Sequence, residues 1–290
     1  MSKTVYSLAL LLMLSGAHSA SQEQPFPIFE GPYAGQTQPG MVSERFAPGF
    51  VSTAGYDLTP TFSPALDEVF FGRRPTEEGG DNRIYYSRMV KGRWQPPVLA
   101  SFSSPGMEYE AQFSADGNTL YFNRGKMLFF SRRTAAGWSE ARALEPPVDE
   151  GMCAAVARND TLYFTAVRNK SYGIYCARLV DGRYQTPELA IPMAAHPWVA
   201  PDESFMVFDK YGFAGGIQTS KLFVSFRQKD SSWSEPVALG RDINATGTEL
   251  IAKVSPDGRF LFFQRKGDGN TDIYWVDAKV MAQAKAAIRP

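Results

Sequence analysis

A turn that recurs five times along the chain constrains the fold more than any other feature of the sequence. The two fullest copies are Ser114-Ala115-Asp116-Gly117 and Ser255-Pro256-Asp257-Gly258, and each follows a strand-like run. The five turns begin at Ser63, Ser114, Ala157, Ala200 and Ser255. They are therefore 51, 43, 43 and 55 residues apart, a period typical of four-stranded propeller blades. The sequence predicts an all-β fold, a single five-bladed β-propeller.

Each repeat continues with the other strands of a blade in the same order. A dense apolar run such as Leu120-Tyr121-Phe122 follows the turn and predicts a strand buried on both faces. A third run is rich in aromatic residues, as in Leu128-Phe129-Phe130, which favours a further strand. The fourth element carries an aromatic residue and often a proline, which an outermost strand tolerates because one edge is free. These aromatic residues are Trp94, Trp138, Tyr184 and Trp233.

The fifth repeat lacks a fourth strand, and the N-terminal region supplies a candidate. Residues 42–48 resemble the fourth strands and precede the first blade, whereas the Ala- and Lys-rich stretch after Val276 predicts a short helix. We expect the N-terminal strand to complete the last blade and close the ring, so that no strand edge stays exposed. The predicted organisation is one propeller domain, 42–276, with an irregular lead-in, 21–41, and a helical tail, 277–290.

The first twenty residues are typical of a secretory signal peptide. Lys3 forms a basic N-terminal region, Val5–Leu14 forms an apolar stretch, and Ser15–Ala20 is rich in small residues, as a cleavage site requires. The apolar stretch is too short to span a bilayer. The sequence therefore predicts an exported protein, periplasmic or secreted, with no membrane insertion.

The charge balance excludes some partners. The chain has 30 Lys and Arg residues and 30 Asp and Glu residues, so its formal net charge is zero. A neutral chain has no general electrostatic attraction to nucleic acid or to an anionic membrane. We expect a monomer whose partner is an envelope protein, a peptide or a glycan.

The innermost strands predict which side chains line the axis of the ring. Residues at odd positions before the turn are apolar and are expected to pack the blades together, whereas those at even positions are mixed. If a pocket exists, the even positions should line it. The ligand-binding candidates among them are Glu110, Cys153, His196, Trp198 and Lys253.

Three carboxylates, Asp57, Glu108 and Glu249, lie at one level of three blades that are consecutive around the ring. Converging acids can hold a cation such as Ca²⁺, bind an amine, or act as a catalytic acid and base. Alternatively, each carboxylate caps the loop that enters its blade by accepting hydrogen bonds from local backbone amides. Their recurrence in several blades favours the capping role.

His196 is the one histidine that remains after the signal peptide, and it is expected level with Cys153 and near Glu110. A Cys/His pair can generate a thiolate nucleophile, but a histidine in this place is more often a satisfied inner-strand residue or a ligand contact. A single histidine also disfavours a multi-histidine metal centre. Apart from Ca²⁺ at the carboxylates, we expect no metal and no cofactor. A disulfide between Cys153 and Cys176 is disfavoured because a whole strand is predicted between them.

Two repeats resemble a known family. The run from Glu249 to Phe263, followed by Gly269–Tyr274, is similar to the WD-like repeat of TolB-type periplasmic propellers, and Glu108–Phe122 is a second match. The resemblance covers about residues 42–277. It implies a propeller fold and an exported location. It carries over no catalytic residue, because the matched positions are turn and core positions.

Two hypotheses for function follow. The first is a non-catalytic binding or interaction propeller of the cell envelope. The second is a glycan-cleaving enzyme, because Asp57, Glu108 and Glu249 are similar to the three acids that five-bladed arabinanase- and xylosidase-like hydrolases place around the axis. The separation and burial of these carboxylates distinguish the two hypotheses.

Overall fold

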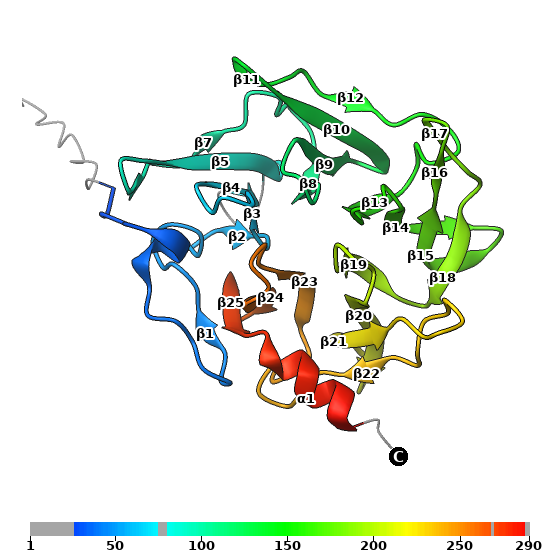
Figure 1. The fold of residues 1–290 in the computed structure, drawn as a ribbon. Coiled ribbons are helices and arrows are strands. Elements are labelled where there is room, and N and C mark those ends of the chain that lie inside the picture. Colours follow the sequence, from blue (N-terminus) through cyan, green and yellow to red (C-terminus); the bar gives the residue numbers. More distant parts are fainter. Residues whose placement is uncertain (1–25, 75–79, 268–269, 288–290) are drawn as a thin grey trace, which may run out of the picture.

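The chain folds as an all-β propeller with one short C-terminal helix (Figure 1). The structure, a computed structural model, describes residues 26–74, 80–267 and 270–287. The predicted signal peptide and the start of the lead-in lie outside the described residues. The lead-in that is described contains one 3₁₀ turn, Pro32–Gly35.

The first strand of each repeat lies nearest the axis and pairs antiparallel with the second strand (Figure 1). The second strands are the dense apolar runs that the sequence predicts to be buried. The innermost strands are β2 (Tyr56–Asp57) with β3 (Thr61–Phe62), β8 (Glu108–Phe113), β13 (Met152–Val156), β19 (Ala195–Val199) and β23 (Glu249–Val254). The second strands are β4 (Glu68–Arg74), β9 (Thr119–Arg124), β14 (Leu162–Arg168), β20 (Phe205–Ala214) and β24 (Phe260–Lys266).

The third strands carry short outer strands on their far edges. The third strands are β5 (Arg83–Val90), β10 (Met127–Thr134), β15 (Ser171–Ala177), β21 (Ile217–Phe226) and β25 (Thr271–Asp277). The outer strands that pair with them are β6 (Arg93–Trp94), β7 (Val98–Leu99), β11 (Gly137–Trp138), β12 (Arg142–Ala143), β18 (Glu188–Pro192) and β22 (Val237–Ala238). β16 (Leu179–Val180) and β17 (Arg183–Tyr184) pair with each other.

The N-terminal region pairs with the last strand of the sheet. β1 (Glu44–Arg45) lies antiparallel to β25, with Glu44 opposite Trp275. The amide of Phe46 extends this ladder by donating to the carbonyl of Ile273 at 2.7 Å. This is the pairing that the predicted completion of the last blade requires.

Three of the five recurring turns begin with a serine whose hydroxyl holds the turn, whereas the other two begin with Ala157 and Ala200. Ser255 Oγ accepts hydrogen bonds from the amides of Arg259 (3.1 Å) and Phe260 (3.0 Å) and contacts Asp257 at 2.6 Å. Ser114 makes the same kind of contacts. The glycines that close these two turns have φ of +73° and +74°, which glycine adopts without steric cost. In the three turns that begin with serine, one hydroxyl therefore satisfies backbone amides of the tight turn.

Aromatic side chains of the second strands fill the space between neighbouring sheets. Phe70, Phe122, Phe164 and Phe208 are fully buried. Burial of one such side chain stabilises the fold by about 1.5–3 kcal/mol. The repeated apolar runs are therefore the main source of the core.

The C-terminal helix α1 (Lys279–Ala287) packs on the edge of the ring beside β21 and β22. Val280, Met281 and Ala284 are buried in a cluster that also contains Phe226 and Leu239. Among the described residues, no helix is long and apolar enough to cross a membrane.

A bulge interrupts the strict alternation expected for the innermost strands. Glu110, Cys153, His196 and Ile251 occupy the same position in four repeats, and each has a positive φ, between 51° and 59°. The pairing register shifts at this position in all four strands. Such conformations cost about 1–3 kcal/mol for a residue other than glycine, and they persist only where the surroundings impose them. The bulge turns these residues toward the axis.

Candidate axial site

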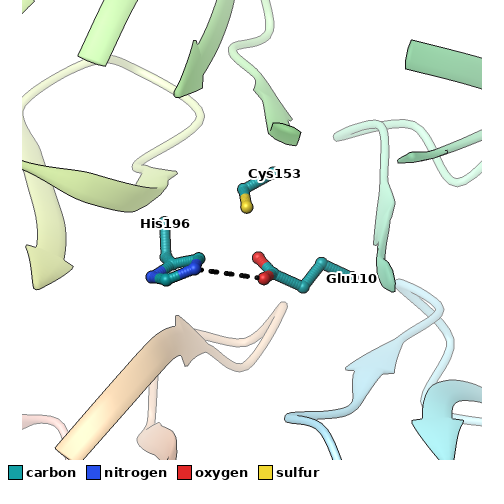
Figure 2. Close-up of side chains that lie close together, drawn as sticks. All are labelled: Glu110, Cys153 and His196. Atoms are coloured by element: carbon teal, nitrogen blue, oxygen red, sulfur yellow. Dashed lines mark ion pairs between the residues drawn. The ribbon is translucent and has the colours of Figure 1, made fainter. Parts of the chain in front are cut away.

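The bulge brings three chemically different side chains together at the axis. Glu110 comes from β8, Cys153 from β13 and His196 from β19, and Figure 2 shows them pointing toward one another. One carboxylate oxygen, the sulfur and one ring nitrogen all lie within 4.8 Å of one another. His196 Nε2 lies 3.4 Å from Glu110 Oε1. The sequence predicted this proximity from the level of the three residues in their repeats.

Asp209, on β20, orients His196, and the sequence did not lead us to predict this role. Its Oδ1 lies 2.7 Å from His196 Nδ1 and also accepts the amide of Ile251 at 3.1 Å. Asp209 is fully buried, and its Oδ2 has no hydrogen-bond partner among the described residues.

A signal for Asp209 was present in the alignment of the repeats. In each second strand a buried phenylalanine is followed by a residue that is polar in four of the five repeats. In two repeats besides that of Asp209, the side chain of this residue accepts a hydrogen bond from the backbone amide of a bulge residue. Asn123 accepts from Cys153 at 3.3 Å, and Thr165 accepts from His196 at 3.0 Å. The column reads Gly72, Asn123, Thr165, Asp209 and Gln264. Asp209 is the one ionisable residue among these five aligned positions, which distinguishes it from the others.

Burial and neighbouring charges shift the acid–base properties of the cluster. Burial lowers the pKa of His196, but the carboxylates of Asp209 and Glu110 outweigh it and hold the pKa well above its ordinary value. Burial, reinforced by the charge of Glu110, raises the pKa of the Cys153 thiol to about 12. The thiol is therefore protonated at neutral pH, and as a metal-free thiol it is a poor nucleophile. Cys153 and Cys176 are both free cysteines.

Lys253 bridges the innermost strands across the axis. Its ammonium group donates to the carbonyl of Ala111 at 2.7 Å and to the carbonyl of Thr59 at 3.1 Å. Burial lowers the pKa of this lysine to about 8, although Glu110 and Cys153 oppose the shift. Lys253 thus links three repeats by hydrogen bonds, and two of its donors are engaged within the protein.

Trp198 lies at the start of a groove on the side of the ring that carries the recurring turns. Its ring packs 5.6 Å from that of Phe205, and 7% of its surface is exposed. A hollow of about 120 Å³ near the axis and a second of about 600 Å³ beside α1 share Arg158, Trp198 and Pro256. We call these two adjoining hollows the turn-side groove.

The three carboxylates predicted at one level are fully buried and paired with arginines. Each acid contacts the arginine that follows sixteen positions later in the sequence. The pairs are Asp57 with Arg73 (2.7 Å), Glu108 with Arg124 (2.9 Å) and Glu249 with Arg265 (3.1 Å). All three acids have no exposed surface.

The same carboxylates accept hydrogen bonds from the loops that enter their strands. In each case the amide four residues earlier donates, from Thr53 at 2.6 Å, from Ser104 at 3.0 Å and from Ala245 at 3.1 Å. Glu249 also accepts from the amides of Thr246, Gly247 and Thr248. Charge-assisted bonds of this kind hold loops in place. The contacts are those of loop caps, and they occupy the oxygens that a catalytic acid or base would use.

The two acid-containing regions therefore differ in what they can do chemically. The acids of the acid–arginine pairs are closed to solvent, and their oxygens are engaged by arginines and backbone amides. The axial cluster offers a carboxylate, a thiol and an imidazole at one point, which are the donors of a metal centre.

Comparisons with known proteins agree with the fold. No protein-family model matches the chain, and no curated protein matches it in sequence. Similar solved structures include TolB from Acinetobacter baumannii, with a TM-score of 0.53, 15% identity, and coverage of 78% of this chain and 53% of that chain. This chain thus spans about half the length of that TolB. A putative TolB from Agrobacterium tumefaciens has a TM-score of 0.50 and 12% identity, with 78% of each chain covered.

An enzyme has a similar overall fold. The α-L-arabinofuranosidase from Podospora anserina, solved in complex with cellotriose, has a TM-score of 0.50 and 10% identity and covers 86% of this chain and 96% of that chain. Identities this low show the fold alone. The resemblance to TolB-type propellers predicted from the repeats is confirmed at this level.

Proposed function

We propose that this protein is an exported, non-catalytic β-propeller that binds an extended peptide segment of another cell-envelope protein. In this proposal the ring has five blades, one for each repeat, and β1 completes the last blade through its pairing with β25. The signal-peptide pattern of residues 1–20 and the fold shared with TolB support a periplasmic or secreted location. The protein acts as a monomer.

The turn-side groove is the observation that carries this proposal. Its floor is apolar, with Trp198, Phe205 and Met281, and its lining includes the basic residues Arg158 and Lys285. A groove of this composition suits apolar side chains flanked by acidic ones. A peptide fits better than a glycan, because Trp198 is buried against Phe205 and leaves little ring face for stacking on a sugar.

The geometry does not favour the glycan-cleaving alternative. A hydrolase of this kind needs one protonated carboxylic acid and one carboxylate that reach the substrate. Asp57, Glu108 and Glu249 are instead closed to solvent and held by arginines and backbone amides. Their arrangement supports a scaffold role.

The proposal is tested by selection from a library of unstructured peptides against mature protein that is immobilised by its C-terminus. We expect the selected peptides to alternate apolar and acidic residues. Their dissociation constants for soluble wild-type protein are then measured by isothermal titration calorimetry. Arg158→Glu reverses one exposed charge of the groove and should weaken binding at least tenfold, equivalent to about 1.4 kcal/mol.

Lys229→Glu is the matched control, because Lys229 is exposed and lies outside the groove lining. This variant should bind the peptides as the wild type does. Equal weakening by both substitutions would indicate general charge attraction, and selection of no peptide by the folded wild type would overturn the proposal.

A further inference from the structure

We propose that Glu110, Cys153 and His196 bind one divalent transition-metal ion, Zn²⁺, at the axis of the propeller. The three side chains offer a carboxylate oxygen, a sulfur and an imidazole nitrogen (Figure 2). Thiolate and imidazole ligands select Zn²⁺ over Ca²⁺ and Mg²⁺, which prefer oxygen. The inference goes beyond peptide binding, since the turn-side groove is lined by other residues.

The distances fit a tetrahedral centre. Two ligand atoms that are each about 2.0–2.1 Å from a tetrahedral Zn²⁺ lie about 3.3 Å apart. His196 Nε2 and Glu110 Oε1 are 3.4 Å apart. All three ligand atoms lie within 4.8 Å of one another, so small side-chain rotations bring the sulfur to its bonding distance.

Asp209 provides an independent observation that points to a metal. Protein metal sites commonly place a carboxylate on the far nitrogen of a ligating histidine, which fixes the tautomer and orients the ring. Asp209 Oδ1 lies 2.7 Å from Nδ1 of His196, so the Nδ1 proton is held there and Nε2, which lies 3.4 Å from Glu110, is the nitrogen left to bind an ion. Asp209 is thus a positioning residue of the proposed site.

The backbone prepares the site before any metal arrives. The three ligands come from three different innermost strands, and each occupies the left-handed residue of the same bulge. The bulge amides of Cys153 and His196 are held by Asn123 and Thr165. The ligands are therefore fixed by the repeat architecture and need little ordering when the ion binds.

A bound Zn²⁺ also balances the buried charge. Coordination replaces the proton of the Cys153 thiol and the Nε2 proton of the His196 imidazolium, and both protons leave to solvent. The carboxylates of Glu110 and Asp209 and the thiolate then carry three negative charges. The ion and the ammonium of Lys253 carry three positive charges. Buried charges persist where they are paired or coordinate a metal.

Three protein ligands leave the fourth tetrahedral position for water or for a donor atom of a bound molecule. A site of this kind is open rather than purely structural.

The test uses the full mature chain, stripped with a chelator and then titrated with Co²⁺ as a spectroscopic probe and with Zn²⁺ in competition. We expect one equivalent of Co²⁺ to bind with a near-ultraviolet thiolate-to-metal charge-transfer band. Zn²⁺ should displace it and raise the melting temperature by mass action. Metal content after dialysis is measured by mass spectrometry.

Cys153→Ser should remove the charge-transfer band, whereas Cys176→Ser, which changes the other free cysteine, should retain it. Asp209→Asn should keep the band and weaken Zn²⁺ binding by about 10–100-fold, as expected for a residue that orients a ligand. Far-ultraviolet circular dichroism verifies that each variant is folded.

Three results would overturn the proposal: no stoichiometric binding by the folded wild type, a charge-transfer band that persists in Cys153→Ser, or one that is lost in Cys176→Ser. The peptide-binding test in the presence of a chelator keeps the two proposals separate. Failure of metal binding with peptide binding intact refutes the metal site alone.

Discussion

Two groups of buried acids contrast in this protein: Asp57, Glu108 and Glu249 on innermost strands, and Glu110 and Asp209 at the axial cluster. The repeats use the two groups differently. The carboxylates of Asp57, Glu108 and Glu249 repeat one local design, with an amide four residues earlier and an arginine sixteen residues later. The axial cluster repeats only its backbone bulge, while its side chains differ in every blade.

This difference distinguishes residues that stabilise the fold from residues that form a candidate functional site. A side chain that serves folding can serve several blades, and three repeats here carry the same acid with the same partners. The axial cluster occurs once and takes one residue from each of three repeats. Unique residues on a repeated backbone are therefore the better candidates for function in a propeller, and recurring acids are the weaker ones.

Glu249→Gln should produce the largest effect and would sharpen this contrast. It leaves Arg265, whose side chain is 11% exposed, without its carboxylate partner. Removing one partner of a buried pair costs about 3–5 kcal/mol. The free energy of unfolding from urea denaturation should fall by that amount. An unchanged free energy of unfolding in this variant would contradict the structural role that we assign to Glu249.

Lys253→Met should change the pH dependence of stability. The pKa of Lys253 is about 8 in the folded protein against 10.5 for the free side chain, so the unfolded state binds more protons between these values. Wild-type stability therefore gains about 3 kcal/mol from this group as the pH rises from 8 to 10.5.

The variant lacks the titrating ammonium and should lose this rise, measured by urea denaturation with a chelator present. Lys229→Met, at an exposed position, is the control and should follow the wild type. Parallel curves for Lys253→Met and the wild type would contradict the burial of a charged lysine at the axis.

Ser255→Ala should have an intermediate effect on the scaffold. The hydroxyl of Ser255 accepts hydrogen bonds from two backbone amides of the turn, and both amides lose this acceptor in the variant. We expect a loss of about 1–2 kcal/mol in the free energy of unfolding. Ser114→Ala removes the equivalent contact and should cost a similar amount. Unequal losses would show that the two turns are not equivalent in the fold.

Glu30→Gln should have the smallest effect and is the exposed counterpart of Glu249→Gln. Glu30 pairs with Arg93 at 2.7 Å, but both side chains are more than half exposed. Exposed pairs of this kind contribute less than about 1 kcal/mol. A difference in melting temperature between this variant and the wild type should be hard to detect. A loss as large as that of Glu249→Gln would mean that burial does not distinguish the two pairs.

Local rules were sufficient to predict most of the strands. The serine turns, the apolar second strands and the pairing of residues 44 and 45 with β25 follow from short stretches of sequence. The bulge could not be predicted in this way, because no glycine marks it. Ile251 adopts a positive φ despite its branched side chain, which tertiary packing must impose.

The site was predictable only in part. The level of Glu110, Cys153 and His196 in the aligned repeats indicated that they are neighbours, and the structure places them together. The expectation of no metal besides Ca²⁺ rested on the single histidine, and the metal titration proposed above tests it. Asp209 stands in a different strand from the candidates, so the alignment of the innermost strands did not include it.

The sequence by itself determined the repeat, the order of strands in each repeat and the residues that fill the core, because the turn motif and the apolar pattern of each strand are properties of short stretches of sequence. Tertiary structure decided which acids are closed off by arginines and which converge on the axis. It also decided that Lys253 spans the ring and that His196 is oriented by Asp209. These contacts join residues from different blades or strands, and their distances depend on how the sheets are arranged around the axis.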